Sequence, residues 1–429
     1  MPDIVAHVQA SLDRIDDLDS TINAFVTVDR EGALRAAKHV DPKALLAGLT
    51  IGVKDNLDVA GLPCSYGSEL FADRVAAQDG TAIAQLRAGG AVIIGKTMLT
   101  ELACGTTGTA TPRGDTINPW AHDRMTGGSS SGSAAAVASG MVDAAIGSDT
   151  SCSIRLPAAH CGIVGLKPTY DRISRLGLSV CASSLDHIGP LARSVATVAQ
   201  MLKVMQGAGH DDPTTRVSDP IDGVRVGVLQ GEFLDECEPD IRMRFNTAIE
   251  LLRSLGAEIT QLDLGEVLGC DVMSIENEMT ALTAEMLDHY GERLNQFEQQ
   301  GGKISPSLRH WFDIYETITP ADRSRALDRQ AELRDQVAAV MESAGIDVLA
   351  CPTVRVTAGL RAGASEADRG PRVLNCTLFD VTGQPSLTVP CGFDRAGLPI
   401  GLLLTGRVNA DALVLQVGHA YKGALTTAP

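Results

Sequence analysis

The chain has 429 residues, of which 44% are hydrophobic and only 3% aromatic, so we expect a large aliphatic core and no extensive disorder. Its formal net charge of −17 argues against binding to nucleic acid or to an anionic membrane surface, because both are held mainly through Lys and Arg. Ten cysteines without a C-x-x-C pair, and no apolar run long enough to span a bilayer, predict a cytoplasmic protein with reduced thiols.

Strand-like and helix-like segments alternate in the first part of the chain. Apolar residues recur every three or four positions at its start, which predicts an amphipathic helix containing Ile4, Val8, Leu12 and Ile15. Residues 49–53 and 91–94 are short apolar runs typical of strands, whereas residues 81–87 and 97–103 have helical character. This alternation predicts an α/β domain with helices on the faces of a sheet.

Two serine-rich turns lie within residues 127–157. The first turn, residues 127–133, is too rich in Gly and Ser for the interior of a helix or strand. We expect residues 134–141 to form a helix whose small side chains allow close packing and whose N-terminus is capped by a serine. A short apolar run leads into the second turn, residues 147–153, which repeats the design.

Further elements follow in the second part of the chain. Residues 185–191 are expected as a loop, residues 211–222 as a linker and residues 271–344 as mostly helical. We expect strands at residues 224–229, 346–351, 385–389 and 400–404, and helices at residues 194–205, 240–255 and 410–421. Because strands lie on both sides of the helical segment, we expect one domain over residues 1–429, with residues 211–344 as a variable, mostly helical part that could cover a functional site.

Ser153 and Lys54 are the residues with the clearest chemical potential. Ser153 follows a turn and precedes a possible helix start, where several backbone N–H groups can point toward a developing oxyanion. A serine nucleophile needs a base, and His160 is the nearby imidazole. Lys54 could also be that base, if burial after its apolar strand leaves it neutral. Taken singly, Ser153 is more simply explained as a helix cap and Lys54 as a solvated or paired lysine.

The combination of motifs changes this interpretation. G-V-K-D at residues 52–55, G-G-S-S-S-G-S-A-A-A-V-A at 127–138 and G-S-D-T-x-x-S-I-R at 147–155 closely resemble the amidase signature family. Further matches lie at residues 165–169, 186–190, 351–353, 382–392 and 397–402. The resemblance implies a single large α/β domain of amidase-signature type, with a mixed β-sheet covered by helices on both faces.

The resemblance also implies a catalytic triad and a mechanism. Ser153 would be the nucleophile, Ser129 the serine of a cis peptide and Lys54 the base. The backbone N–H groups of Thr150, Ser151, Cys152 and Ser153 would hold the oxyanion, and the relay would return its proton to the leaving amine before water hydrolyses the acyl-enzyme. No metal or organic cofactor is required, and the nine histidines include no His-Glu-x-x-His pair. We expect the protein to bind a small-molecule amide and to bind neither nucleic acid nor a membrane. A homodimer is a possible assembly.

Two positions depart from the family pattern. Members usually carry Gly-Gly before the nucleophile, whereas this chain has Ser151 and Cys152. If that loop needs positive φ, their side chains impose strain, and they could narrow the acyl pocket. Cys152 could be a reactive thiol, although a small buried residue is the simpler interpretation. Arg155 is expected to form a structural ion pair and Asp149 to fix the loop by hydrogen bonding.

Several alternative functions can be compared. Residues 128–132 match the G-x-S-x-G elbow of α/β-hydrolases, but no buried strand precedes them, and the turn lacks the G-K-[ST] ending of a P-loop. A glutaminase-type subunit of a tRNA-dependent amidotransferase is the main alternative to a stand-alone amidase. Such subunits usually have Gln where Leu156 stands, which favours the stand-alone enzyme. A non-catalytic binding protein derived from an amidase is the third possibility, against which the intact Lys54, Ser129 and Ser153 argue.

Overall fold

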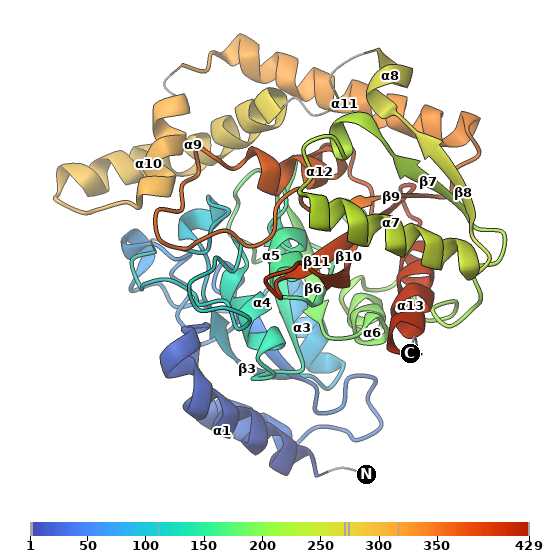
Figure 1. The fold of residues 1–429 in the computed structure, drawn as a ribbon. Coiled ribbons are helices and arrows are strands. Elements are labelled where there is room, and N and C mark those ends of the chain that lie inside the picture. Colours follow the sequence, from blue (N-terminus) through green and yellow to red (C-terminus); the bar gives the residue numbers. More distant parts are fainter. Residues whose placement is uncertain (1–2, 110, 270–271, 273–274, 316, 428–429) are drawn as a thin grey trace.

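One mixed sheet contains all the strands, from the first in the chain to the last (Figure 1). The computed structural model describes residues 3–109, 111–269, 272, 275–315 and 317–427, and within these residues the sheet has eleven strands. In spatial order the strands are β1 (Phe25–Val28), β3 (Val92–Thr97), β2 (Thr50–Lys54), β4 (Ala144–Asp149), β6 (His187–Ala192), β5 (Val164–Lys167), β10 (Ser386–Phe393), β11 (Pro399–Gly406), β9 (Val348–Pro352), β7 (Arg225–Leu229) and β8 (Glu258–Leu262). β2 runs parallel to β3 and β4, and β7 runs parallel to β8 and β9, while the other neighbours are antiparallel.

Helices cover both faces of this sheet, because most strands are buried on both sides. Ala144 and Ile146 of β4 pack into one hydrophobic cluster and Ala145, between them, into another, as the two-residue repeat of a strand requires. The first face is covered by α3 (Thr81–Ala88), α6 (Val195–Met205), α7 (Pro239–Ser254) and α13 (Asp411–Thr427). The second is covered by α1 (Ile4–Ile22), α2 (Arg30–Ala37), α4 (Ser131–Ala138), α5 (Arg155–His160) and α12 (Gly370–Val381). The predicted α/β fold with a mixed sheet between helices is confirmed.

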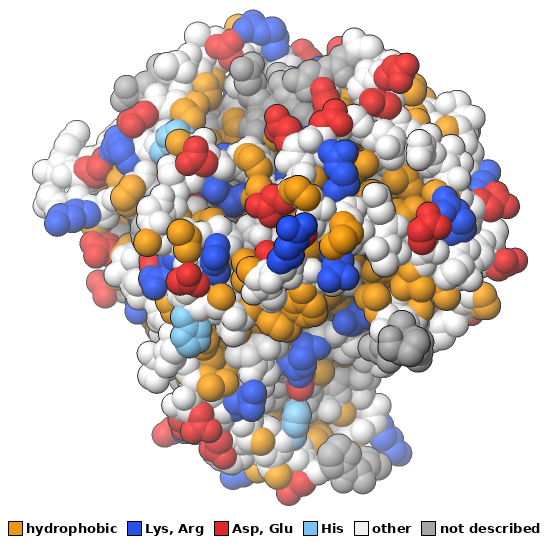
Figure 2. All heavy atoms as spheres, in the orientation of Figure 1, with side chains coloured by type: hydrophobic (Ala, Val, Ile, Leu, Met, Phe, Trp, Pro, Cys, Tyr) orange, Lys and Arg blue, Asp and Glu red, His pale blue; other side chains and the backbone are white. Residues whose placement is uncertain are grey.

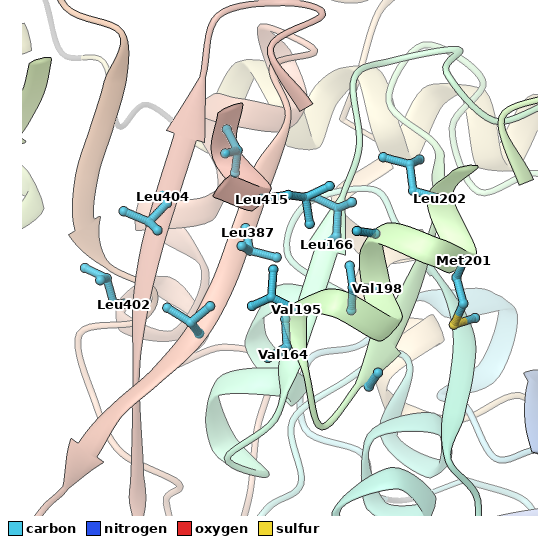
Figure 3. Packing of buried hydrophobic residues seen from close by; sticks show 14 of the residues in the cluster. Val164, Leu166, Val195, Val198, Met201, Leu202, Leu387, Leu402, Leu404 and Leu415 are labelled. Carbon is cyan, nitrogen blue, oxygen red and sulfur yellow. The ribbon is translucent and has the colours of Figure 1, made fainter. Parts of the chain in front are cut away.

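Aliphatic side chains hold the first layer to the sheet. Figure 3 shows Val198 of α6 close to Leu166 of β5, and Val164 of β5, Leu202 of α6 and Leu387 of β10 belong to the same cluster. All five side chains are fully buried, and each contributes about 1.5–3 kcal/mol through the removal of its surface from water. The core is therefore aliphatic, as the low aromatic content predicts.

Four helices follow between β8 and β9 in the chain. They are α8 (Leu264–Leu268), α9 (Ile275–Gln299), α10 (Pro306–Tyr315) and α11 (Pro320–Ser343). α9, α10 and α11 lie at the top of Figure 1, at the opposite end of the molecule from α1. Residues 211–344 also supply β7 and β8 to the sheet, and Asp271, where the helical pattern was expected to begin, lies outside the described residues. No helix among the described residues is both long enough and apolar enough to cross a membrane.

Charges of both signs cover the surface. On the face drawn in Figure 2, acidic and basic side chains are interspersed. Several arginines have carboxylate partners, such as Arg225 with Asp347 at 2.7 Å and Arg74 with Asp58 at 2.7 Å. On this face the acidic excess of the chain is therefore not gathered into one patch.

Some local predictions were wrong. Residues 185–191, expected as a loop, contain most of β6, which is a central strand between β4 and β5. Its Gly189-Pro190 pair suggests a turn, but pairing with strands on both sides outweighs that local signal. Residues 97–103, expected as helical, hold only the end of β3 and a short 3-10 turn, η2 (Glu101–Ala103). The elements that were not predicted include β1, α2, β5, β8, α8 and α12.

Candidate active site

Lys54 and Ser148 meet at the carboxyl edge of the sheet. β2 and β4 are parallel neighbours, so their last residues lie side by side. Lys54 ends β2 and is completely buried. Its Nζ donates hydrogen bonds to Ser129 Oγ at 2.7 Å and Ser148 Oγ at 2.8 Å, and Ser148 O lies 3.3 Å away. The expected burial of Lys54 is confirmed, and the lysine lies against the first serine-rich turn.

The surroundings of Lys54 change its protonation. Burial lowers the pKa of Lys54 from 10.5 to about 7, because the low-dielectric interior disfavours the charged amine, and the negative charges of Asp149 and Asp186 oppose this shift only in part. Burial also raises the pKa of Asp186 to about 6, although hydrogen bonds from Thr150 and from backbone N–H groups stabilise its carboxylate. A substantial fraction of Lys54 is therefore neutral near pH 7, as a general base requires.

The first serine turn contacts Lys54 through Ser129. The Gly128–Ser129 peptide bond is cis, and Gly127 has a φ of 76°, a conformation that favours glycine. The predicted serine cap of α4 is absent, because the Ser130 hydroxyl donates to Ser148 O at 3.2 Å and not to the helix. The close packing predicted for the helix is confirmed, since Ala134, Ala135 and Ala136 are fully buried. Gly132, in the first turn of α4, lies even closer to its neighbours, because a Cβ there would be 2.3 Å from Ala24 O.

The second serine turn connects β4 to α5 and is held from both ends. The Asp149 carboxylate accepts hydrogen bonds from the backbone N–H of Ile154 at 3.0 Å and from Arg155 Nε at 3.0 Å. The Thr150 hydroxyl donates to Asp186 at 2.7 Å. Ser130 N donates to Ser153 O at 3.2 Å, which fastens the two serine turns together. Lys54, Ser129 and Ser153 are thus brought to one edge of the sheet.

The second turn leaves hydrogen-bonding groups unused. In the part of the chain that the structure describes, the backbone N–H groups of residues 150–153 donate to no protein acceptor, and the Ser153 hydroxyl has no partner. Ser153 is 6% exposed and lines a cavity. Unpaired N–H groups beside a serine at a cavity wall are what an oxyanion site requires.

Ser151 and Cys152 fit this turn without the strain considered above. Neither residue has positive φ. Cys152 is fully buried and packs in the cluster that contains Leu156 and Cys376, and burial raises the pKa of its thiol well above the usual value. A thiol that stays protonated is a poor nucleophile, which favours the interpretation of Cys152 as a packing residue. The Ser151 hydroxyl lies 3.3 Å from that of Thr377 in α12.

A buried ion pair supports the turn from behind. Arg155 contacts Asp149 at 3.0 Å and also pairs with Asp380 of α12, and all three side chains are fully buried. Burial alone would raise the pKa of Asp149, but the charge and hydrogen bonds of Arg155 hold this pKa well below its usual range. Arg155 Nη2 also donates to Ser151 O at 2.9 Å. Both residues therefore have the structural roles that the sequence predicts.

His160 is not placed as a base for Ser153. It is fully buried at the end of α5, where Asn118 donates to its backbone oxygen at 3.2 Å. Burial lowers the pKa of His160 to about 4, and its ring has no hydrogen bond to Ser153. Among the described residues, no group of three or more His, Cys, Asp or Glu side chains could hold a metal ion.

Two pockets lie in this region, and the chemistry distinguishes them. The cavity at Ser153 measures about 20 Å³, which is room for about one water molecule. It is lined by Ala103, Cys104, Gly105, Thr106, Thr150, Ser151, Cys152, Ser153, Leu282 of α9, Trp311 of α10 and Arg369. A larger pocket of about 380 Å³ lies among Tyr66, Phe71 and Tyr290, but Ser153 does not line it. We therefore place the candidate active site at the smaller cavity.

Sequence reasoning missed four residues of this site. Ser148 and Asp186 lie inside the motifs G-S-D-T and D-H-I-G-P, so the resemblance could have indicated them. Trp311 and Arg369 lie in no such motif and reach the cavity only through the packing of α10 and the loop before α12.

Known proteins resemble this chain over nearly its whole length. A family model described as Amidase matches residues 6–415. A glutamyl-tRNA(Gln) amidotransferase subunit of Cyanothece sp. is 35% identical, over 97% of this chain and 93% of its own length. The native peptide amidase of Stenotrophomonas maltophilia superposes with a TM-score of 0.83 at 28% identity, covering 100% of this chain and 94% of its own. A structure described as a vestigial protein complex that reveals the origins of an s-triazine catabolic enzyme gives a TM-score of 0.89 at 29% identity, covering 98% of this chain and 95% of its own. Further relatives also carry the amidotransferase name, which agrees better with the glutaminase-type alternative than with a stand-alone amidase.

Proposed function

The chain belongs to the amidase family, and we propose that it hydrolyses an amide C–N bond through an acyl-enzyme formed on Ser153. The contact that carries this proposal is the 2.7 Å hydrogen bond between Lys54 Nζ and Ser129 Oγ, made by a completely buried lysine. A neutral amine there can accept a proton from Ser129, which makes the pair a base for a neighbouring serine.

Acylation begins when the substrate enters the cavity and the Ser153 hydroxyl comes within hydrogen-bonding distance of Ser129. Hydrogen bonds of this kind are often loose without substrate and tighten in the complex. As Ser153 Oγ attacks the amide carbon, its proton passes to Ser129 Oγ while the Ser129 proton passes to Lys54 Nζ. The backbone N–H groups of residues 150–153 stabilise the oxyanion, each contributing up to about 3–4 kcal/mol in a preorganised site.

The second half of the cycle returns the protons. Lys54, now charged, gives a proton back through Ser129 to the leaving nitrogen, and the C–N bond breaks. A water molecule then attacks the ester carbon of Ser153, with the same relay as its base. The carboxylic acid product leaves and Ser153 regains its proton. Lys54 can both accept the proton and give it back, because its pKa of about 7 lies near neutral pH.

The choice of amide follows from two opposing observations. The names of the relatives favour a glutaminase-type subunit that works with a protein partner, so glutamine is the first substrate to test. Leu156, which is fully buried where such subunits usually have Gln, favours a stand-alone amidase.

We also propose that residues 211–344 cover the site and vary with the substrate, because Leu282 and Trp311 line its cavity.

Labelling with a fluorophosphonate tests the proposal. Wild-type protein should be labelled and should release ammonia from glutamine or from simple amides, and Ser153→Ala should do neither. Ser254→Ala, which changes an exposed serine at the end of α7, is the matched control and should behave as wild type. Labelling or turnover that survives in folded Ser153→Ala would rule out Ser153 as the nucleophile. Ammonia release that requires an added partner protein would identify the glutaminase-type role.

A further inference from the structure

We propose that Cys104 and Cys181 form a site of reversible oxidation, at which a peroxide joins the two thiols into a disulfide and slows the enzyme. Their Sγ atoms lie 3.7 Å apart, although 77 positions separate the two residues in the chain. Both cysteines are unpaired by any disulfide, and both are buried. Because the sulfurs of a disulfide lie about 2.0 Å apart, an approach of roughly 1.7 Å from the present 3.7 Å would form the bond.

The cavity at Ser153 gives an oxidant a route to this pair. Cys104 is among the described residues that line the cavity, and Cys181 is not. The cavity has room for about one water molecule, and hydrogen peroxide is only slightly larger than water. Cys104 is therefore the thiol that meets the peroxide first, and Cys181 is the thiol behind it.

The hydrogen bond between the two thiols gives them different roles. It raises the pKa of Cys181 well above its usual value, and burial raises this pKa further, so Cys181 keeps its proton. A protonated Cys181 can donate its S–H to Cys104 Sγ, and such a hydrogen bond stabilises the thiolate of Cys104. Since the thiolate is the form that attacks a peroxide, we assign Cys104 as the peroxide-reacting residue and Cys181 as the resolving residue.

The oxidation takes two steps that balance in atoms and electrons. The Cys104 thiolate attacks one oxygen of hydrogen peroxide, the O–O bond breaks and hydroxide leaves, so that Cys104 becomes a sulfenic acid. The Cys181 sulfur then attacks the Cys104 sulfur, the S–S bond forms and the S–O bond breaks, and the leaving oxygen departs as water with the Cys181 proton. The two thiols are oxidised and the peroxide is reduced to water. A thiol reductant reverses the modification by exchange.

The backbone before Cys104 is strained, and the residues around it form the cavity wall. Leu102 and Ala103 have φ values of 50° and 60°, a left-handed conformation that is costly for residues other than glycine. Such strain persists only where surrounding contacts enforce it. Ala103, Gly105 and Thr106 line the same cavity as Cys104. A pull on Cys104 would therefore shift a continuous part of that wall.

Cys181 connects the proposed disulfide to the second serine turn. Its backbone N–H donates to the Asp186 carboxylate at 2.9 Å, and this carboxylate also accepts a hydrogen bond from the Thr150 hydroxyl at 2.7 Å. Because a displacement of about 1 Å in an active site can cost a factor of about 10² in rate, we expect the disulfide to lower kcat/KM about 10- to 100-fold. This effect on the rate rests on the proposed function of Ser153, whereas the disulfide itself does not.

Mass spectrometry of wild type treated with hydrogen peroxide tests the modification without any need for turnover. The intact protein should lose the mass of two hydrogen atoms. Trypsin should then release residues 97–113 joined to residues 176–193, each of which contains one cysteine, and dithiothreitol should separate them. Met286 Sδ lies 2.9 Å from Cys104 Sγ and is the competing target. Treated protein whose two peptides stay unlinked, or which gains oxygen at Met286 in place of the link, would overturn the proposal.

Substitutions separate the roles of the two thiols. In Cys181→Ser the sulfenic acid has no resolving thiol, so Cys104 should be labelled by dimedone and no linked peptide should form. Cys104→Ser should show neither the link nor a dimedone label on Cys181. Cys237→Ser, which changes a buried cysteine that does not line the cavity, is the matched control and should form the link as wild type does. A dimedone label on Cys181 in Cys104→Ser would contradict the assigned order. The wild-type result needs no substitution, so it decides the question even if a variant does not fold.

Amide hydrolysis measured before oxidation, after oxidation and after reduction tests the effect on the enzyme. The linked protein should be about 10- to 100-fold slower, and dithiothreitol should restore the rate. Fully linked protein that keeps its full rate would overturn the regulatory effect. Wild type that hydrolyses no amide but still forms the link would refute the proposed function and leave the oxidation site intact.

Discussion

The protonation of Lys54 should control the rate of the enzyme. Raising the pH from 6 to 8 deprotonates a lysine whose pKa is about 7, so the neutral fraction rises from about 9% to about 91%. We therefore expect kcat/KM to increase about tenfold over this range and to level off above pH 8. A solvated lysine with a pKa of 10.5 would instead give a rate that still rises steeply at pH 9.

Initial rates at low substrate concentration, in buffers of constant ionic strength, measure this profile, and circular dichroism at each pH confirms that the protein stays folded. Asp186→Asn removes a negative charge that raises the pKa of Lys54, so its midpoint should move to lower pH. Asp347→Asn removes a surface carboxylate paired with Arg225 and should leave the midpoint unchanged. A wild-type midpoint above pH 9, or no response to Asp186→Asn, would refute the assignment of Lys54 as the base.

Four further predictions concern the same site. Ser129→Ala should lower kcat about 10²–10⁴-fold with little change in the melting temperature, because a positioned proton carrier contributes about that factor, as steady-state kinetics and thermal unfolding can check. Arg155→Met should reduce the free energy of unfolding by about 3–5 kcal/mol in urea, because two buried carboxylates lose their cation. Between pH 7 and 10.5 an unfolded lysine binds a proton that folded Lys54 lacks, so wild-type stability should rise with pH relative to Lys54→Met, by up to about 1.4 kcal/mol per pH unit in urea titrations. Cys152 should resist iodoacetamide in the folded protein, as mass spectrometry of the peptides will show, because its thiol is buried and protonated.

Each of these predictions has an outcome that contradicts it. Full activity in Ser129→Ala would rule out Ser129 as the proton relay. An unchanged unfolding midpoint in Arg155→Met would show that the ion pair adds no stability. Parallel pH–stability curves for wild type and Lys54→Met would mean that Lys54 titrates normally. Rapid alkylation of Cys152 would identify it as a reactive thiol beside the cavity.

The sequence predicted those parts of the site that depend on local order. Lys54 ends an apolar strand, a position compatible with burial, but only its combination with the two serine turns favoured a buried base over a solvated or paired lysine. The two serine turns were evident from the sequence, because segments so rich in Gly and Ser rarely form the interior of a helix or strand. Cys152 was interpreted correctly as a buried residue, but the positive φ considered for its turn is absent at both Ser151 and Cys152, so their side chains impose no left-handed strain.

The remaining features depend on contacts between distant segments. β6 contains Gly189-Pro190, and only its pairing with β4 and β5 makes a strand of a sequence that resembles a turn. Trp311 comes from a segment that was predicted only to be mostly helical, and Arg369 lies in none of the motifs that the sequence shows. Their contact, and the approach of Arg369 to Ser151, arise from packing that no periodicity encodes.

The central claim is that an acyl group is attached to Ser153 during turnover. Rapid acid quench of wild type with an amide substrate, followed by digestion with trypsin, would isolate residues 125–155, which include both Ser129 and Ser153. We predict that this peptide gains the mass of the acyl group and that fragmentation places the added mass on Ser153. An active enzyme whose peptide stays unmodified throughout turnover, or one that carries the acyl group on another residue, would contradict the mechanism.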